Sequence, residues 1–142
     1  MSHTRILLHV IWATKNRNPI ISKELKPLLL NHIKDNSIKK GIFIESMNCV
    51  EDHIHLLISL SADQAIAKVV MLIKGESSFW INKEKLIPVK FEWQFDYFAV
   101  SVSESIAEKV KQYIANQEEH HKKKTFMEEY TDFLNAYKFE TV

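Results

Sequence analysis

The sequence is poor in cysteine, glycine and proline, and the first two scarcities each exclude a class of protein. Its 142 residues include one cysteine, two glycines and three prolines. Because Cys49 has no second cysteine to pair with, no intrachain disulfide can form, and a reducing, cytoplasmic setting is expected. Neither Gly41 nor Gly75 lies in a phosphate-loop pattern, which argues against a P-loop nucleotide-binding protein.

Long apolar runs and an excess of charge of one sign are also missing. Polar residues interrupt the apolar stretch near the N-terminus, and no small-residue cleavage site follows it. We therefore predict neither a signal peptide nor a transmembrane span. The net charge of +1 provides no broad basic field, so charge alone does not indicate nucleic-acid binding. The length and the 46% hydrophobic content predict a single domain that spans residues 1–142.

Hydrophobic periodicity and capping residues divide the chain into strands and helices. Strands are predicted over residues 5–14, 42–50, 53–60 and 97–102. One helix is predicted over residues 22–40, with Ser22 as its N-cap, and a second from about residue 62 past residue 73, capped by Ser61. A third is predicted over residues 106–121, with a capping box of Ser105 and Glu108. A last helix follows a Thr125–Glu128 box and carries Tyr130, Phe133, Leu134 and Tyr137. This order predicts an α+β fold: a ferredoxin-like, RRM-like βαββαβ antiparallel sheet with its helices on one face, plus C-terminal helices.

Two histidines stand two residues apart in "EDHIHLLISL", residues 51–60. Side chains alternate along a strand, so His53 and His55 share one face while Ile54, Leu56 and Ile58 share the other. The aliphatic face is predicted to lie under the helices, which leaves the histidines on an open face. Their Cβ atoms would be roughly 6.5–7 Å apart, close enough for both imidazoles to bind one metal ion. A pair of surface histidines is the alternative.

Four further residues are candidates for the same site. Asp52 is placed to orient an imidazole as a hydrogen-bond acceptor, and His9 lies on the non-core face of its own strand. Tyr113 and Gln117 are four residues apart in "VKQYIANQEEHH", so they lie on one face of the predicted helix. Each feature is common by itself; the combination of H-x-H on a strand with Y-x-x-x-Q on a later helix is not.

Together these motifs resemble the HUH-type single-tyrosine transposases of small bacterial insertion sequences (transposase 200-like) and their domesticated relatives associated with repetitive palindromes. The likeness runs along nearly the whole chain. It includes "HVIWATKNR" near the start, "EDHIHLLISL" as the HUH motif, "IKGESS" after the second predicted helix, and "SVSES" leading into the tyrosine helix.

The resemblance implies a DNA transposase that cleaves and rejoins single-stranded DNA through a 5′-phosphotyrosine. Tyr113 would be the nucleophile, and His53, His55 and Gln117 would hold one divalent ion. Nitrogen and oxygen ligands with open positions suit Mg²⁺ or Mn²⁺. The implied partners are hairpin-forming DNA ends and a second copy of the chain, whose tyrosine helix acts in trans.

Basic residues are the candidates for DNA contact: Lys15, Arg17, Lys74, Lys122 and Lys123. One departure from the resemblance concerns the strand before the tyrosine helix. Relatives usually carry glycines there, whereas this chain reads "FDYFAVSVS". Glycine would allow close approach of DNA to the backbone. Without it, the resemblance does not determine the path of DNA past Tyr97 and Phe98.

Four other readings remain. An HUH nicking endonuclease shares the chemistry, but such enzymes are usually longer and often carry two tyrosines. A histidine-triad hydrolase needs a third histidine where this chain has Leu57. An RNA-binding βαββαβ module would need base-stacking aromatics on its open face. The fourth reading is a domesticated hairpin-binding protein.

Overall fold

A computed structural model describes residues 2–119, 124–125, 128–129 and 131–132. Its regular elements are β1 (Ile6–Ala13), η1 (Lys15–Arg17), α1 (Leu25–Lys39), β2 (Phe43–Cys49), β3 (His53–Leu60), α2 (Ile66–Lys83), β4 (Phe98–Val102), η2 (Glu104–Ile106) and α3 (Ala107–Ala115). The four strands form one sheet in the order β2-β3-β1-β4, and every neighbouring pair is antiparallel. This confirms the predicted α+β fold and its βαββαβ order.

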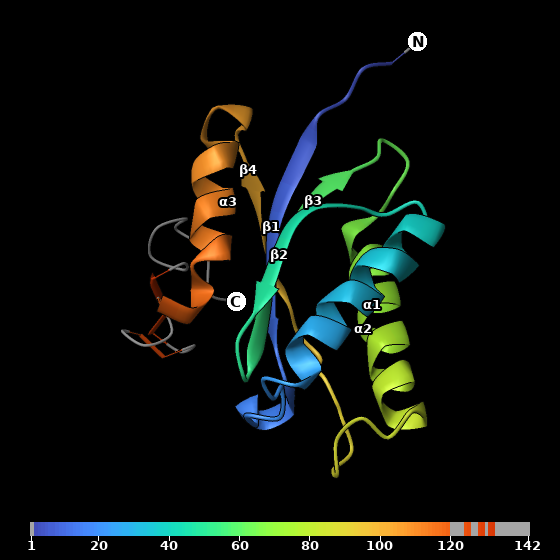
Figure 1. The fold of residues 1–142 in the computed structure, drawn as a ribbon. Helices are drawn as coiled ribbons and strands as arrows, with labels where there is room; N and C mark the ends of the chain where they lie inside the picture. Colours follow the sequence, from blue (N-terminus) through green and yellow to red (C-terminus); the bar gives the residue numbers. More distant parts are fainter. Residues whose placement is uncertain (1, 120–123, 126–127, 130, 133–142) are drawn as a thin grey trace.

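Helices cover both faces of the sheet, with α1 and α2 on one side and α3 on the other (Figure 1). On the α1 and α2 side, the apolar face of β3 enters the main core, as its alternating pattern predicts. This core includes Val10, Trp12, Leu29, Ile33, Ile54, Leu56, Ile58, Val70 and Ile73. On the other side α3 packs over β2 and β3, where Ile114 joins a smaller apolar cluster with Leu7 and Leu57.

The helix boundaries confirm some of the predicted caps and correct others. The Ser22 hydroxyl accepts a hydrogen bond from the Leu25 backbone at 3.1 Å, and Gly41 follows α1 with a positive φ of 70°, as predicted for the two ends of that helix. The expected start of α2 near residue 62 is wrong. The helix begins at Ile66 and continues through Gly75 to Lys83, because Gly75 is tolerated inside a helix that packs on the core.

The start of the tyrosine helix also differs from the prediction. Ser103, rather than Ser105, accepts a backbone hydrogen bond, and a 3-10 turn precedes α3. Glu108 does not complete the expected capping box, because its carboxylate pairs with Lys111 at 3.3 Å. The predicted Thr125–Glu128 box is present, with both reciprocal hydrogen bonds. The predicted residues Tyr130, Phe133, Leu134 and Tyr137 lie outside the described residues.

Candidate active site

The histidine pair is buried, which corrects the expectation of an open face. His53 and His55 are both 0% exposed. The alternation of β3 places them on the face opposite its apolar core residues. It is over this face that α3 packs, against β2 and β3 (Figure 1). The prediction considered only the helices of the βαββαβ unit and not the cover that the next helix provides.

Each imidazole is oriented through its Nδ1 atom. His53 Nδ1 lies 2.7 Å from Asp52 Oδ1; since a carboxylate only accepts, this nitrogen donates and Nε2 is left facing the site. His55 Nδ1 lies 2.9 Å from His9 Nε2. Burial lowers the pKa of His9 to about 4, so His9 is neutral at pH 7. Its Nε2 can therefore accept a hydrogen bond from His55 Nδ1–H. Asp52 thus contacts an imidazole as the sequence suggested, and His9, which was expected only on the non-core face, contacts the other imidazole.

Glu129, which the sequence analysis missed, faces both histidines. Its carboxylate oxygens lie 3.0 Å from His53 Nε2 and 3.9 Å from His55 Nε2. Burial alone would lower the pKa of His53, but the hydrogen bonds that His53 donates to Asp52 and Glu129 outweigh it, and the pKa is raised above 6.5. The only local signal in the sequence is the Thr125–Glu128 capping box, which Glu129 directly follows. In the structure the Glu129 N–H donates to the Thr125 carbonyl at 3.0 Å.

Tyr113 lies on the same side of the sheet, against the histidines. Its ring centroid is 6.1 Å from that of His9 and 5.7 Å from that of His55, both in edge-on geometry. Its hydroxyl donates to Glu129 Oε1 at 2.5 Å. Burial, and then this hydrogen bond, raise the pKa of Tyr113 well above its ordinary value of 10.0. The phenol is therefore protonated at neutral pH.

Gln117 completes the group just after α3 ends. The helix ends at Ala115, a turn follows at Asn116, and helical residues resume at 117. The Gln117 side chain is 0% exposed, and its Nε2 donates to the Tyr113 carbonyl at 3.3 Å. Among the described residues, no hydrogen-bond partner reaches Gln117 Oε1. A buried acceptor in this state is costly unless a ligand satisfies it.

These donors fit a divalent metal ion. One ligand atom from each of His53, His55 and Glu129 lies within 4.8 Å of the others. The orphaned Gln117 oxygen adds a donor of the type that Mg²⁺ and Mn²⁺ accept. The set is thus the predicted His53, His55 and Gln117, extended by a carboxylate.

Three of the candidate DNA-contact residues, Lys15, Arg17 and Lys74, lie in the part of the chain that the structure describes. Lys15 is exposed and lies 3.4 Å from Glu92, and Arg17 is exposed with a positive φ of 54°. Lys74 instead donates to the carbonyls of residues 94, 95 and 96, each at 2.9 Å. Burial lowers its pKa to about 8. Lys122 and Lys123 lie outside the described residues. DNA contact by this set stays a prediction.

The strand without glycines runs beside the site. Phe98 and Val100 pack with Ile11 and Ala13, and Val100 lies opposite His9 across the β1–β4 ladder. Cross-strand partners share a face, so these side chains cover the sheet next to the histidines. A ligand approaching along β4 would meet these side chains, not the bare backbone that glycines would leave.

A four-stranded antiparallel sheet that carries a histidine pair, followed by a helix that carries a tyrosine, is the arrangement that the sequence resemblance implied for a transposase. Residues 2–117 match the family described as "Transposase IS200 like", and the chain belongs to this family. ISDra2 transposase TnpA of Deinococcus radiodurans is 30% identical over 115 residues, which cover 77% of this chain and 81% of that protein. The transposase for insertion sequence element IS200 of Salmonella typhimurium is 25% identical over 130 residues, covering 86% and 84%.

Solved structures share the fold. The crystal structure of a protein assigned as a transposase from Deinococcus radiodurans matches with a TM-score of 0.64 and 26% identity, over 82% of this chain and 93% of that one. The structure of a REP-associated tyrosine transposase bound to a REP hairpin matches with a TM-score of 0.63 and 15% identity, over 85% and 74%. In the part of this chain that the structure describes, no helix is both long and apolar enough to cross a bilayer.

Proposed function

We propose that this transposase cleaves and rejoins single-stranded DNA at the ends of an insertion element, through a 5′-phosphotyrosine intermediate on Tyr113. One observation carries the proposal. The half-buried Tyr113 ring lies against His55, which packs on His53, and the buried Gln117 amide donates to the Tyr113 carbonyl, although the two pairs come from distant parts of the sequence. Membership of the IS200-like family supports the assignment to DNA.

The chain's own residues divide the work of the transesterification. Tyr113 Oη attacks the scissile phosphorus, and the bond from phosphorus to the 3′ oxygen breaks. Glu129 Oε1 already accepts the hydroxyl hydrogen bond and would take the proton that Tyr113 loses. The 3′ oxygen leaves and takes up a proton to become a free 3′-OH, while the 5′ phosphate remains on Tyr113. Because one phosphodiester replaces another, the reverse step rejoins DNA without ATP.

His53, His55 and Gln117 would hold one Mg²⁺ or Mn²⁺ ion, with Glu129 as a further oxygen donor. When bound, such an ion polarises the scissile phosphate and stabilises the charge on the leaving oxygen. Asp52 and His9 hold the two imidazoles at Nδ1, which keeps each Nε2 directed at one position.

The proposed substrate is a DNA end that folds into a hairpin, and the proposed assembly is a cytoplasmic homodimer. In the described chain Tyr113 lies against the histidines of its own sheet. Only residues 103–106 separate β4 from α3, so the helix could dock on a partner's sheet and make the same contacts there, as in element exchange between protomers. The trans arrangement implied by the resemblance would therefore require a change only in the connection between β4 and α3.

The catalytic proposal is tested by incubating the protein with single-stranded element ends and Mn²⁺ and searching for a covalent band on a denaturing gel. We expect the band in the wild type and none in Tyr113→Phe, which keeps the ring. Tyr97→Phe is the matched control and should retain the band. A band that persists in Tyr113→Phe would overturn the nucleophile assignment.

The assembly is tested by mixing two inactive proteins, His53→Ala/His55→Ala and Tyr113→Phe, under conditions of subunit exchange. Assembly in trans places all the defects in one site of each heterodimer and leaves the other site intact, so cleavage returns. Assembly in cis leaves a defect in every site. We expect recovery; exchange shown by a tag pull-down without cleavage would reject the trans assembly and leave Tyr113 and the metal set standing.

A further inference from the structure

The end of the tyrosine helix is held by an asparagine on a neighbouring strand. Asn48 Nδ2 donates to the carbonyl oxygens of Ile114 at 3.0 Å and Ala115 at 3.1 Å. These are the last two residues of α3. Carbonyls in the last turn of a helix have no partner within it, so Asn48 supplies from β2 the cap that the helix cannot make itself.

The orientation of this amide is determined by all three of its hydrogen bonds. Asn48 Oδ1 accepts from the Cys49 backbone N–H at 3.0 Å, while Nδ2 faces two carbonyls. If the amide were flipped, Oδ1 would face the carbonyl oxygens of Ile114 and Ala115, and the Nδ2 hydrogens would face the Cys49 N–H. The three hydrogen bonds therefore fix the orientation of the Asn48 amide and hold the end of α3 against β2.

Asn48 lies beside the histidine site. In the β2–β3 ladder it is the cross-strand partner of His55, and such partners point to the same face of the sheet. The amide therefore ties the end of α3 to the strand position next to a candidate metal ligand. Gln117, whose buried side-chain oxygen has no hydrogen-bond partner among the described residues, follows two residues after the capped carbonyls.

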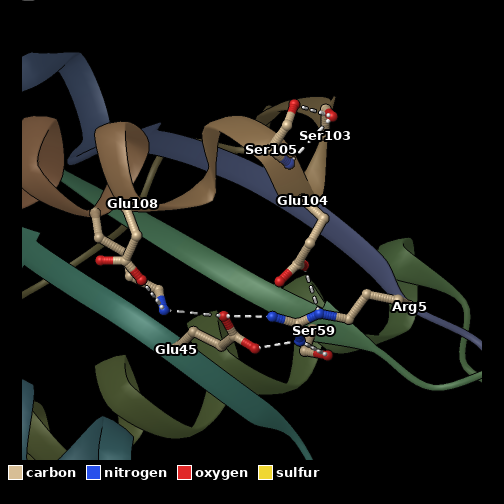
Figure 2. Close-up of polar contacts among 8 residues, drawn as sticks. Arg5, Glu45, Ser59, Ser103, Glu104, Ser105 and Glu108 are labelled. Atoms are coloured by element: carbon tan, nitrogen blue, oxygen red, sulfur yellow. Dashed lines mark hydrogen bonds and ion pairs between the residues drawn. The ribbon is translucent and has the colours of Figure 1, made fainter.

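A second connection holds the opposite end of the same helix, but it is weaker. Arg5 bridges Glu45 of β2 and Glu104 of η2 (Figure 2), and Lys111 of α3 lies 3.5 Å from Glu45. Arg5 and Glu104 are exposed, whereas Glu45 and Lys111 are half-buried. Ion pairs with such access to solvent contribute little, because water and salt screen them. The half-buried amide at position 48 is the more specific restraint and lies nearer the chemistry.

We propose that Asn48 is a positioning residue: by capping Ile114 and Ala115 it ends α3 at the Asn116 turn and so directs the Gln117 oxygen toward the histidine pair. This inference rests on the proposed function only for the consequence, which is metal affinity. The placement of Gln117 is a property of the fold and can be measured without metal.

The first experiment follows the Gln117 side-chain amide by NMR in the metal-free protein. In the wild type this amide is buried and hydrogen-bonded, so its hydrogens should exchange slowly with solvent. Asn48→Ala should accelerate their exchange. Asn82→Ala is the matched control, because Asn82 bridges the N–H and carbonyl of Phe91 at 2.7 and 2.9 Å in another part of the fold. It should lower Tm and leave the Gln117 signal unchanged. A Gln117 amide that stays protected in Asn48→Ala would overturn the inference, whatever metal the protein binds.

The second experiment measures Mn²⁺ affinity by calorimetry. Loss of a residue that orients a metal ligand typically weakens binding by about 10–100-fold, and we expect this for Asn48→Ala but not for Asn82→Ala. Asn48→Asp keeps the shape and loses the donors, and its negative charge would by itself attract Mn²⁺. A fall in affinity in this variant therefore supports positioning, and a rise opposes it.

A double-mutant cycle then separates the inference from the proposed function. If Asn48 acts through Gln117, adding Asn48→Ala to Gln117→Ala should weaken Mn²⁺ binding no further. Two additive losses would overturn the link. If Gln117→Ala alone leaves Mn²⁺ affinity unchanged, the proposed ligand set fails, and the amide-exchange result alone decides whether Asn48 positions Gln117.

Discussion

The two faces of the sheet are built from the same strands but serve different ends. On the α1 and α2 face, β1 and β3 contribute only apolar side chains to the main core. On the α3 face the same strands contribute His9, His53 and His55, with an apolar cluster around Leu57 at one end. The alternation of side chains along a strand separates these roles. A residue's face therefore decides whether its loss should affect stability alone or metal binding and chemistry as well.

The sharpest test of this comparison removes the histidine pair. His53→Ala/His55→Ala should abolish both Mn²⁺ binding and DNA cleavage, because the two Nε2 donors are lost together. Since both side chains are buried, some stability is lost as well. His32→Ala is the control on the other face, where His32 stacks on Trp80 with ring centroids 3.8 Å apart. It should leave the calorimetric signal for Mn²⁺ intact. Unchanged Mn²⁺ affinity in the double variant would refute the metal assignment.

Neighbouring leucines on β3 offer a matched pair. Leu56 lies in the main core and Leu57 lies under α3, and both are fully buried. Truncation of either to alanine should cost about 2–5 kcal/mol in the free energy of unfolding. Only Leu57→Ala should also weaken Mn²⁺ binding, because it loosens the packing of Ile114 and the helix that carries Tyr113 and Gln117. Equal Mn²⁺ affinities in the two folded variants would contradict the division between faces.

A smaller effect is expected from the orienting carboxylate. Asp52→Asn keeps the size of the side chain but can present an N–H to His53 Nδ1 in place of an acceptor. The pKa of His53, which NMR titration reports, should fall, and Mn²⁺ affinity should drop by about 10–100-fold. Tm should change little, because Asp52 is not part of either apolar cluster. A His53 pKa that does not move would show that Glu129, rather than Asp52, controls it.

The smallest effect concerns the ion pairs of Glu45 on β2, with Arg5 and with Lys111 of α3. The hydrogen bond from Arg5 lowers the pKa of Glu45 below 4.5. Its stabilisation is therefore fully present above pH 4.5 and is lost as the pH falls through the lower folded-state value. Glu45→Gln should reduce Tm slightly at pH 7, and the difference from wild type should vanish toward pH 3 in a thermal denaturation series. A difference that persists in acid would show that packing, not charge, is responsible.

Much of the site could be predicted from local pattern. The placement of His53 and His55 away from the α1 and α2 core follows from alternation along β3, and Asp52 lies where it was expected to orient an imidazole. The i, i+4 spacing brought Tyr113 and Gln117 to one side, although a turn at Asn116 interrupts the helix between them. Burial of the histidines could not be foreseen, because it depends on where α3 docks. Glu129 was missed because its neighbours in sequence carry no sign of the histidines that it faces.

The sequence by itself determined the order of strands and helices, the antiparallel sheet, and the division of β1 and β3 into an apolar and a histidine-bearing face. These follow from periodicity and capping, which act between residues a few positions apart. Only the tertiary structure decided that α3 closes over the histidines, that Glu129 meets Tyr113, and that Asn48 caps a helix 66 residues further along the chain. Such contacts depend on how two elements dock, and docking is chosen by the packing of whole surfaces, to which no single stretch of sequence is a guide.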